Sequence, residues 1–262
     1  MANGTQKGPF TLNPLTKRCS AMYNLRPLAR STLEQSTFDL LRCLAKIAFD
    51  LIHSSLDTRT QQMTLDAVKE EVSTDLLAYH ERDPSVRHKP ISCLVSVYST
   101  YFAIFSYRLS HQLIRHAGDD EGTTREAMHL SFAARSNTGI EIHPEALIGK
   151  RFVIDHGWGT VIGQTVEIGD DCYLLNNITL GGRDVADAHD GKRHPTIGDR
   201  VQICARAKVF GPIIVGDDCF IGPDVTLTED LARGTTLLHG RGPVVTGTFR
   251  EAERTPALAG LS

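Results

Sequence analysis

Residues 162–180 read IGQTVEIGDDCYLLNNITL, and in this stretch an aliphatic side chain recurs at every sixth position. A six-residue repeat is typical of a parallel β-helix, whose short faces each contribute one inward aliphatic side chain. A β-sandwich would alternate with a period of two instead. The stretch therefore predicts a parallel β-helix. Along the chain the series comprises Ile142, Ile148, Ile154, Ile162, Ile168, Leu174, Leu180, Ile197, Ile203, Val209, Val215, Ile221 and Leu227.

A second row of small or aliphatic residues precedes this series by two positions, and we expect it to point inward as well. Glycine often follows the aliphatic residue, where the chain turns a corner between two faces. The second row comprises Val166, Cys172, Ile178, Val201, Ala207, Ile213, Cys219 and Val225.

The repeat is interrupted twice. The step from Ile154 to Ile162 is eight residues instead of six, and residues 181–195 separate Leu180 from Ile197. Repeat proteins place such insertions on one face, often the face that binds a ligand. Both interruptions are rich in ionisable side chains, whereas the regular repeats are not. We therefore expect the chemistry of this protein at the two interruptions.

The chain before the repeat has a helical period. Ser31 and Glu34 form a capping box, and apolar residues recur at helical spacing after them. Two further amphipathic stretches follow, over residues 65–76 and 91–109. The pattern predicts an α + β fold with four parts: a flexible N-terminal arm (1–30), a helical domain (31–138), a β-helix domain (139–247) and a C-terminal tail (248–262).

Composition excludes several classes of protein. The 262 residues include 28 Lys plus Arg against 31 Asp plus Glu, so the chain lacks the basic excess that nucleic-acid binding requires. We find no signal-peptide pattern and no apolar run long enough to span a membrane, and we expect no membrane association. The six cysteines form no C-x-x-C pair, which favours reduced thiols and a cytoplasmic location.

Adjacent ionisable residues stand out in each interruption: Asp155 with His156, and Arg193 with His194. A carboxylate that holds one imidazole nitrogen leaves the other as a base near neutral pH. An arginine can bind a substrate carboxylate with its forked donors. Taken singly, each histidine could equally be a structural hydrogen-bonding residue at a corner. The combination at both interruptions favours catalysis.

The motifs of this chain resemble those of the serine O-acetyltransferase family. The resemblance rests on GIEIHPEALIGKRFVIDHGWGTVIGQTVEIGDDCYLLNNITLGG (139–182), GKRHPTIGD (191–199), DLLAYHERDPSV (75–86) and YRLSH (107–111). It implies a helical domain followed by a left-handed parallel β-helix of hexapeptide repeats. It also implies a homotrimer, or a dimer of trimers, with active sites between neighbouring β-helices.

The activity that the resemblance implies is transfer of an acetyl group from acetyl-CoA to the hydroxyl of L-serine, for cysteine synthesis. Acetyl-CoA would be the co-substrate, and no metal is expected. The implied catalytic residues are the base His156, the carboxylate Glu141 that orients it, and His194 near the reacting centre. The implied serine-binding residues are Asp83 and Asp155 for the ammonium group and Arg193 for the carboxylate. The implied CoA-binding residues are Gly181, Gly182, Ala205, Arg206 and Lys208.

Some positions depart from the family pattern. Gln164 replaces a glutamate close to the site, and Cys204 and Arg206 stand in a segment that is usually small and glycine-rich beside the CoA channel. The resemblance associates docking of the sulfhydrylase partner with a terminal isoleucine. The chain ends in Ser262, so we predict that this complex does not form.

Three alternatives stay open from the residues. The same mechanism could act on homoserine, threonine or another amino alcohol. A zinc enzyme could use His156, His189 and His194, although His189 lies among aspartates that suggest a solvated loop. A non-catalytic scaffold could keep the β-helix and lose the donor site, since fold does not imply function.

Overall fold

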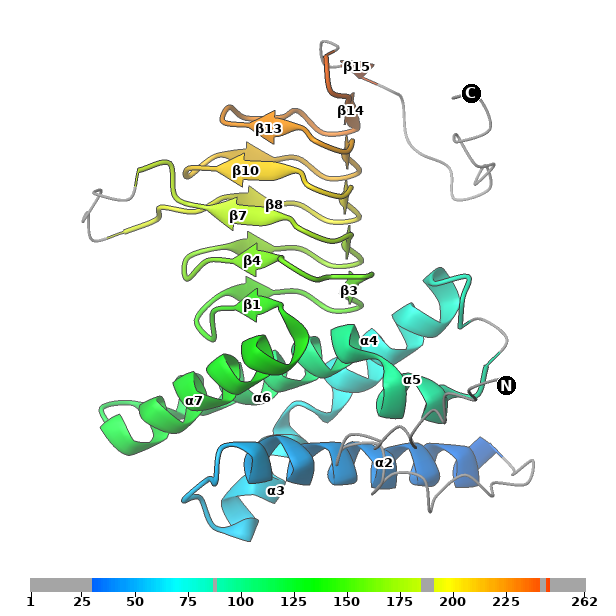
Figure 1. Cartoon of the computed structure of the whole chain (residues 1–262), viewed down its shortest axis with the longest axis vertical. Helices are drawn as coiled ribbons and strands as arrows, with labels where there is room; N and C mark the ends of the chain where they lie inside the picture. The colour runs from blue at the N-terminus through cyan, green and yellow to red at the C-terminus, as the bar shows by residue number, and fades with distance from the viewer. Residues whose placement is uncertain (1–29, 87–88, 185–190, 241–243, 246–262) are drawn as a thin grey trace, which may run out of the picture.

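The computed structural model describes residues 30–86, 89–184, 191–240 and 244–245. A layer of helices lies at one end of the molecule, and a column of short strands stands on it (Figure 1). Apart from Arg30, the predicted arm lies outside the described residues, as does the predicted tail with its terminal Ser262. The described helices are α2 (Arg30–Leu51), α3 (Thr58–Ala67), α4 (Lys69–Arg82), α5 (Ile91–Val97), α6 (Ser99–Ala117) and α7 (Glu121–Thr138).

The helical half was predicted as helical, but its division differs from the predicted stretches. The stretch 65–76 is divided at Val68 into α3 and α4, and the stretch 91–109 is divided at Tyr98 into α5 and α6. Apolar residues are buried with the same spacing on both sides of Val68, so the period cannot reveal the break. None of the described helices combines the length and the apolar composition needed to cross a bilayer.

Helix α7, which the sequence analysis did not identify, leads the chain into the strands. Asp120 caps its start by accepting hydrogen bonds from the amides of Gly122 and Thr123. Gly139 ends it with a left-handed φ of 71°, a conformation that glycine adopts without steric cost. The indole of Trp158 covers Gly139 so closely that a Cβ there would lie 2.4 Å from the ring.

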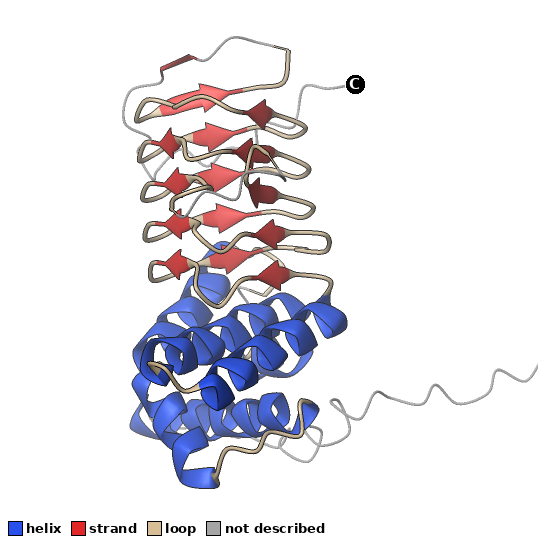
Figure 2. Cartoon of the chain, turned by 90° about the vertical axis from the view of Figure 1, so that its left-hand side faces the viewer, coloured by secondary structure: helices blue, strands red, loops and turns tan. Residues whose placement is uncertain are grey.

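The strands form three parallel sheets, and successive strands enter successive sheets, which is the arrangement of a β-helix (Figure 2). We call the sheets A, B and C. Sheet A contains β1 (Glu141–Ile142), β4 (Val161–Ile162), β7 (Thr179–Gly181), β10 (Lys208–Phe210) and β13 (Thr226–Leu227). Sheet B contains β2 (Leu147–Ile148), β5 (Glu167–Ile168), β8 (Thr196–Ile197) and β11 (Ile214–Val215). Sheet C contains β3 (Val153–Ile154), β6 (Tyr173–Leu174), β9 (Gln202–Ile203), β12 (Phe220–Ile221), β14 (Thr235–Leu237) and the antiparallel β15 (Val244–Val245).

Both predicted rows of inward side chains are buried along the whole column. Neighbouring strands pair in register, so that Ile142 lies beside Ile162, and Ile162 beside Leu180. The core is therefore a stack of aliphatic side chains, one layer for each turn of the coil.

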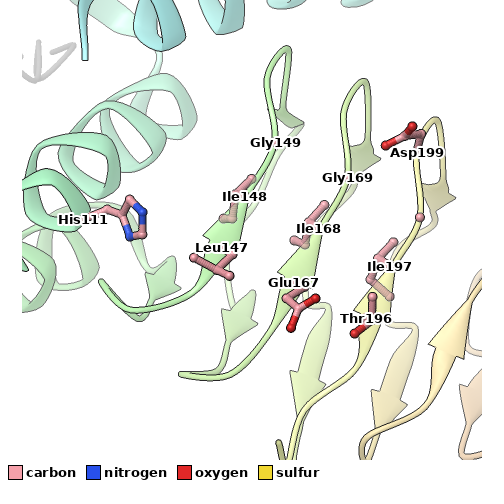
Figure 3. Close-up of a pocket in the computed structure, with 11 residues that line it drawn as sticks. His111, Leu147, Ile148, Gly149, Glu167, Ile168, Gly169, Thr196, Ile197 and Asp199 are labelled. Atoms are coloured by element: carbon pink, nitrogen blue, oxygen red, sulfur yellow. The ribbon is translucent and has the colours of Figure 1, made fainter. Parts of the chain in front are cut away.

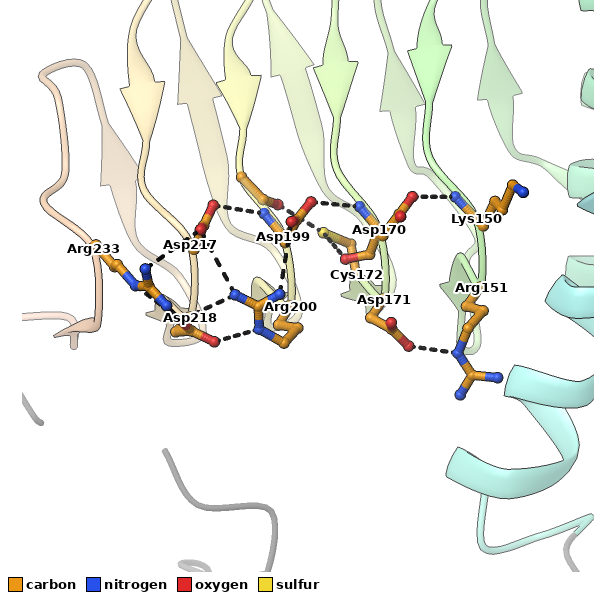
Figure 4. Close-up of polar contacts among 11 residues, drawn as sticks. Lys150, Arg151, Asp170, Asp171, Cys172, Asp199, Arg200, Asp217, Asp218 and Arg233 are labelled. Atoms are coloured by element: carbon orange, nitrogen blue, oxygen red, sulfur yellow. Dashed lines mark hydrogen bonds and ion pairs between the residues drawn. The ribbon is translucent and has the colours of Figure 1, made fainter. Parts of the chain in front are cut away.

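A ladder of aspartates joins the turns at the corner between sheets B and C (Figure 4). The Oδ1 atom of Asp170 accepts the amide hydrogen of Lys150 at 2.7 Å, and that of Asp199 accepts the amide hydrogen of Asp170 at 2.8 Å. A Cβ on Gly149 would lie 2.4 Å from the Asp170 carboxylate, and one on Gly169 would lie 2.2 Å from that of Asp199. Glycine is required at these corners because the carboxylate of the next turn occupies the space of a side chain.

A buried ion pair fixes the helices to the first turn of the coil. Arg108 on α6 donates to Asp75 on α4 through Nε at 2.9 Å and Nη2 at 3.2 Å. The same guanidinium donates to the carbonyl oxygens of Ile148 at 2.6 Å and Gly149 at 2.5 Å. Asp75 also accepts the amide hydrogen of Phe152 at 2.9 Å. Two helices and one corner of the coil thus share a single polar network.

Candidate active site

The predicted base, His156, lies in the loop after β3, at the corner between sheets C and A. Tyr79 holds the strand before it: its hydroxyl donates to the carbonyl of Ile154 at 2.7 Å and accepts from the amide of Ile154 at 3.0 Å. His156 has a left-handed φ of 58°, and 78% of its side chain is exposed. Its Nε2 atom lies 3.9 Å from Oδ1 of Asp155. The loop therefore presents an imidazole outward, beside a carboxylate.

Two of the predicted substrate-binding residues, Asp83 and Asp155, lie close enough to Tyr173 for their charges to act on it. The Tyr173 hydroxyl donates to Oδ2 of Asp155 at 3.0 Å. Asp83 caps the end of α4, is buried, and accepts the amide hydrogen of Ser85 at 2.8 Å. Burial raises the pKa of Tyr173, and the negative charges of Asp155 and Asp83 raise it further. The structure thus places two carboxylates close to one neutral hydroxyl.

Glu141, predicted to orient His156, has a different partner here. Its Oε2 atom lies 3.0 Å from Nη1 of Arg135, at the end of α7. Within the described part of the chain we find no hydrogen bond between Glu141 and His156. The carboxylate that lies beside the imidazole in this chain is that of Asp155.

His194 belongs to a second group, at the opposite edge of sheet A. Only 8% of the residue is exposed, and a Cβ on Gly163 would lie 2.4 Å from its ring. Its Nδ1 atom accepts the amide hydrogen of Thr165 at 3.2 Å and lies 2.8 Å from the Thr165 hydroxyl. The Thr165 hydroxyl oxygen also accepts the amide hydrogens of Arg193 at 3.0 Å and His194 at 3.2 Å. Thr165 thereby fixes both predicted residues of this interruption.

The hydrogen bonds determine the tautomer of His194. Because Nδ1 accepts from an amide, the proton of the neutral ring lies on Nε2, which is free to donate. Burial lowers the pKa of His194, and the charge of Arg193 lowers it further. Burial likewise lowers the pKa of the neighbouring His143. His194 is therefore a neutral hydrogen-bond donor at neutral pH.

The two groups are separated within one chain. His156 precedes strand β4 of sheet A, whereas Thr165 follows it. Four or five extended residues between the two corners span roughly 15 Å. A small amino acid bound at His156 therefore does not reach His194 of the same chain.

The predicted CoA-binding residues lie along sheet A and its edges. Gly181 and Gly182 lie at the end of β7, and Lys208 begins β10. Ala205 and Arg206 lie at the corner between sheets C and A, and Arg206 has a φ of 63°. The exposed guanidinium of Arg206 donates to both oxygens of the Asp224 carboxylate, at 2.6 and 2.7 Å. A phosphate would have to displace this partner.

A surface hollow of about 450 Å³ lies elsewhere, on the outer face of sheet B (Figure 3). It is lined by residues of β2, β5 and β8 and by His111, whose Nδ1 atom lies 2.7 Å from the carbonyl oxygen of Pro144. None of the predicted site residues lines it. In the described ranges no group of three His, Cys, Asp or Glu residues is arranged to hold a metal, and His189 lies outside those ranges.

Sequence reasoning missed the residues that hold the site in place: Tyr79, Thr165 and Tyr173. Each acts across turns of the coil or from a helix, on a residue far away in sequence. Tyr173 follows Asp155 by 18 residues, and His194 follows Thr165 by 29. Searching the turn of the coil that follows Asp155 would have pointed to Tyr173.

Comparison with known proteins identifies the family. No family model matches the chain. The serine acetyltransferase of Helicobacter pylori (strain ATCC 700392 / 26695) is 42% identical over 176 residues, which cover 67% of this chain and 97% of that protein. The serine acetyltransferase of Mycobacterium tuberculosis (strain ATCC 25618 / H37Rv) is 38% identical over 172 residues, covering 65% and 70%.

Solved structures that are similar to this chain are serine acetyltransferases as well. The serine acetyltransferase of Neisseria gonorrhoeae superposes with a TM-score of 0.70 at 28% identity, covering 88% of this chain and 89% of that chain. The serine acetyltransferase of Brucella abortus strain S19 in complex with coenzyme A superposes with a TM-score of 0.69 at 25% identity, covering 89% and 94%. The chain therefore belongs to the serine acetyltransferase family, as its motifs predict.

Proposed function

We propose that this chain is a serine O-acetyltransferase, which moves the acetyl group of acetyl-CoA to the hydroxyl of L-serine and releases CoA and O-acetyl-L-serine. The proposal is carried by the likeness to the Helicobacter pylori protein, which extends over 97% of that protein's length. Two solved relatives add support: the Brucella abortus enzyme was crystallised with coenzyme A and the Neisseria gonorrhoeae enzyme with serine.

His156 acts as the general base. It takes the proton of the serine hydroxyl as that oxygen attacks the thioester carbonyl carbon, because a neutral hydroxyl is a weak nucleophile. The C–S bond then breaks, and the proton returns from the imidazolium to the leaving thiolate. The exposed imidazole beside Asp155 supports this role. Glu141 orients the ring after releasing Arg135, with which it is paired here.

The remaining residues bind the reactants. Asp83 and Asp155 receive the ammonium group of serine, and Arg193 receives its carboxylate in a forked contact. His194 donates from Nε2 to the oxyanion that forms on the thioester carbonyl, for which a neutral donor in a buried position is suited. This role is supported by its tautomer and by its lowered pKa.

Acetyl-CoA extends along sheet A. Gly181 and Gly182 leave the backbone accessible to the ligand because they carry no Cβ. Lys208 and Ala205 line the same side. Arg206 releases Asp224 and binds a CoA phosphate in its place. Support for the exchange comes from the exposure of this ion pair, since exposed pairs contribute little stability.

Two neighbouring chains of a trimer together complete each active site. Two such trimers can pair to form a hexamer. Each site takes Asp83, Asp155 and His156 from one chain and Arg193 and His194 from the next. The separation of roughly 15 Å within one chain supports this arrangement. The left-handed sense of the coil and the domain boundary at residue 139 belong to the same proposal, and both rest on the family likeness.

Mixed assemblies test the shared site. Neither His156→Ala nor Arg193→Ala should be active alone. Co-expressed in equal amounts, their chains mix in closed rings, and about a quarter of the interfaces then combine two intact halves. Activity near a quarter of the wild-type value is expected. An inactive mixture of folded trimers would place both halves in one chain.

We also propose a cytoplasmic location. Every cysteine in the described part of the chain is a free thiol, and free thiols persist in a reducing compartment. Fractionation of the source cells would test this.

The reaction itself is tested by measuring thiol release from acetyl-CoA, with L-serine, homoserine and threonine offered separately. Release with serine is expected, and His156→Ala should reduce kcat by at least about 100-fold, the usual contribution of a general base. His129→Ala, an exposed histidine on α7, is the matched control and should retain full activity. Release only with another acceptor would assign the mechanism to a different pathway. No release with any acceptor would favour the scaffold.

A further inference from the structure

Tyr173 occupies an outward position on sheet C, one turn of the coil beyond Asp155. Strand β6 pairs with β3 so that Tyr173 lies opposite Val153, and Asp155 follows two positions later. Alternation along the strand brings Tyr173 and Asp155 to the same face. The 3.0 Å hydrogen bond from the hydroxyl to Oδ2 closes this contact.

Arg82 contacts the ring of Tyr173. The guanidinium carbon of Arg82 lies 5.1 Å from the ring centroid, a cation–π distance. Its Nη1 atom donates to the carbonyl oxygen of Asp171 at 2.8 Å, which fixes the guanidinium against the coil. Arg82 is the last residue of α4 and directly precedes Asp83. The helix end that supplies one carboxylate therefore also clamps the tyrosine that holds the other.

The hydroxyl remains a donor throughout the working pH range. Burial and the charges of Asp155 and Asp83 raise the pKa of Tyr173 above its ordinary value of 10.0. A protonated hydroxyl has one hydrogen, and here it is directed at Asp155 Oδ2. Oδ1 of Asp155 is left on the side of His156. Among the described residues, Tyr173 is the one side chain that donates a hydrogen bond to the Asp155 carboxylate.

We propose that Tyr173 is a positioning residue: its hydroxyl fixes the rotation of the Asp155 carboxylate so that Oδ1 receives the ammonium group of the acceptor amino acid. The inference rests on the proposed function, because it requires that Asp155 binds that ammonium. The backbone amide of Ser85 holds the partner carboxylate of Asp83 in the same way. Each half of the ammonium site is thus oriented by one neutral donor.

The first test is Tyr173→Phe, measured in the full-length chain with acetyl-CoA and L-serine. Phenylalanine keeps the ring and its contact with Arg82 and removes only the hydroxyl. The KM for serine should rise by about 10-fold, the effect of losing one hydrogen bond to a charged group. The KM for acetyl-CoA should stay unchanged, and the thermal midpoint should change little because Tyr173 is only partly buried. A purely structural role would lower the thermal midpoint or affect both substrates alike.

Tyr107→Phe is the matched control. The Tyr107 hydroxyl is buried and donates to the carbonyl of Ala146 at 2.6 Å, away from both groups of site residues. Its loss should lower the thermal midpoint and leave the KM for serine unchanged. The two tyrosine variants thereby separate positioning from stability.

A double-mutant cycle tests whether Tyr173 acts through Asp155. Asp155→Asn alone should raise the KM for serine, and adding Tyr173→Phe should then change it by less than about twofold, because the two residues act as one unit. Additive effects would overturn the proposal. So would a Tyr173→Phe enzyme that matches an active wild type in its KM for serine, and this result would leave the proposed function intact. A wild type that does not acetylate serine would overturn the function, and this inference with it.

Discussion

The buried pair of Asp75 and Arg108 gives the sharpest prediction about stability. Asp75→Asn keeps the size of the side chain and removes its charge. Arg108 then remains charged with only 5% of its side chain exposed, between α4, α6 and the first turn of the coil. Removing one partner of a buried ion pair leaves the other charge uncompensated, which costs more than the pair itself contributes.

The structure allows the size of the effect to be estimated. The Asp75 carboxylate accepts two hydrogen bonds from Arg108 and one from the amide of Phe152. Two charge-assisted hydrogen bonds at about 1.5 kcal/mol each give about 3 kcal/mol. Breaking buried pairs in other proteins costs about 3–5 kcal/mol, which agrees. We therefore expect the free energy of unfolding to fall by about 3–5 kcal/mol.

Urea unfolding measures this loss, followed by far-UV circular dichroism and by the fluorescence of Trp158, the single tryptophan. Asp50→Asn is the matched control, because it breaks an exposed pair with Lys46 on α2 and should barely change the midpoint. If Asp75→Asn lowers the free energy of unfolding by less than about 1 kcal/mol, the pair does not fasten the helices to the coil.

Two further predictions concern stability. Burial lowers the pKa of His143 and of His194 below the ordinary 6.5, so below that pH the unfolded chain binds protons more readily than the folded chain. The stability that these two neutral histidines contribute is therefore complete above pH 6.5. It is lost as the pH falls through 6.5 toward the lowered pKa values. Urea midpoints measured from pH 8 to 5 would check this, and a flat profile would contradict it. Gly169→Ala would place a Cβ 2.2 Å from Asp199 and should cost about 1–3 kcal/mol by overpacking. Thermal melts of both variants would check this. Gly122→Ala, whose Cβ would lie 3.3 Å from its nearest atom, should lose less stability than Gly169→Ala. Equal losses would show that the corners tolerate a side chain.

The coil could be predicted from sequence because its period comes from one physical requirement. Each short face must bury an aliphatic side chain, so the repeat in the sequence is the repeat in space. No comparable requirement determines where each helix begins and ends. Apolar residues continue across Val68 and Tyr98 because both flanking helices face the same core, and the sequence pattern hides both breaks.

The candidate site could be predicted only in part. His156 and Arg193 stood out because the interruptions of the repeat concentrate ionisable residues. Thr165 and Tyr173 did not, because they occupy regular repeat positions and act on residues a turn away. Nor does the sequence reveal that Glu141 pairs with Arg135, since that contact depends on where α7 ends.

A division of labour follows from the geometry of the coil. In a regular turn the inward positions fill the core, and the corner positions serve the ladder or pair with the next turn, as Arg206 pairs with Asp224. The interruptions add side chains that serve neither purpose and can meet a ligand. His156 and Gly157, with φ values of 58° and 59°, form the two-residue insertion that carries the imidazole clear of the coil. On the proposed function, the inserted His156 acts on the substrate hydroxyl, and Tyr173, a regular residue, orients the adjacent Asp155. The inserted His156 can then be exchanged at little cost to the fold, whereas Tyr173 is constrained by both the fold and the reaction.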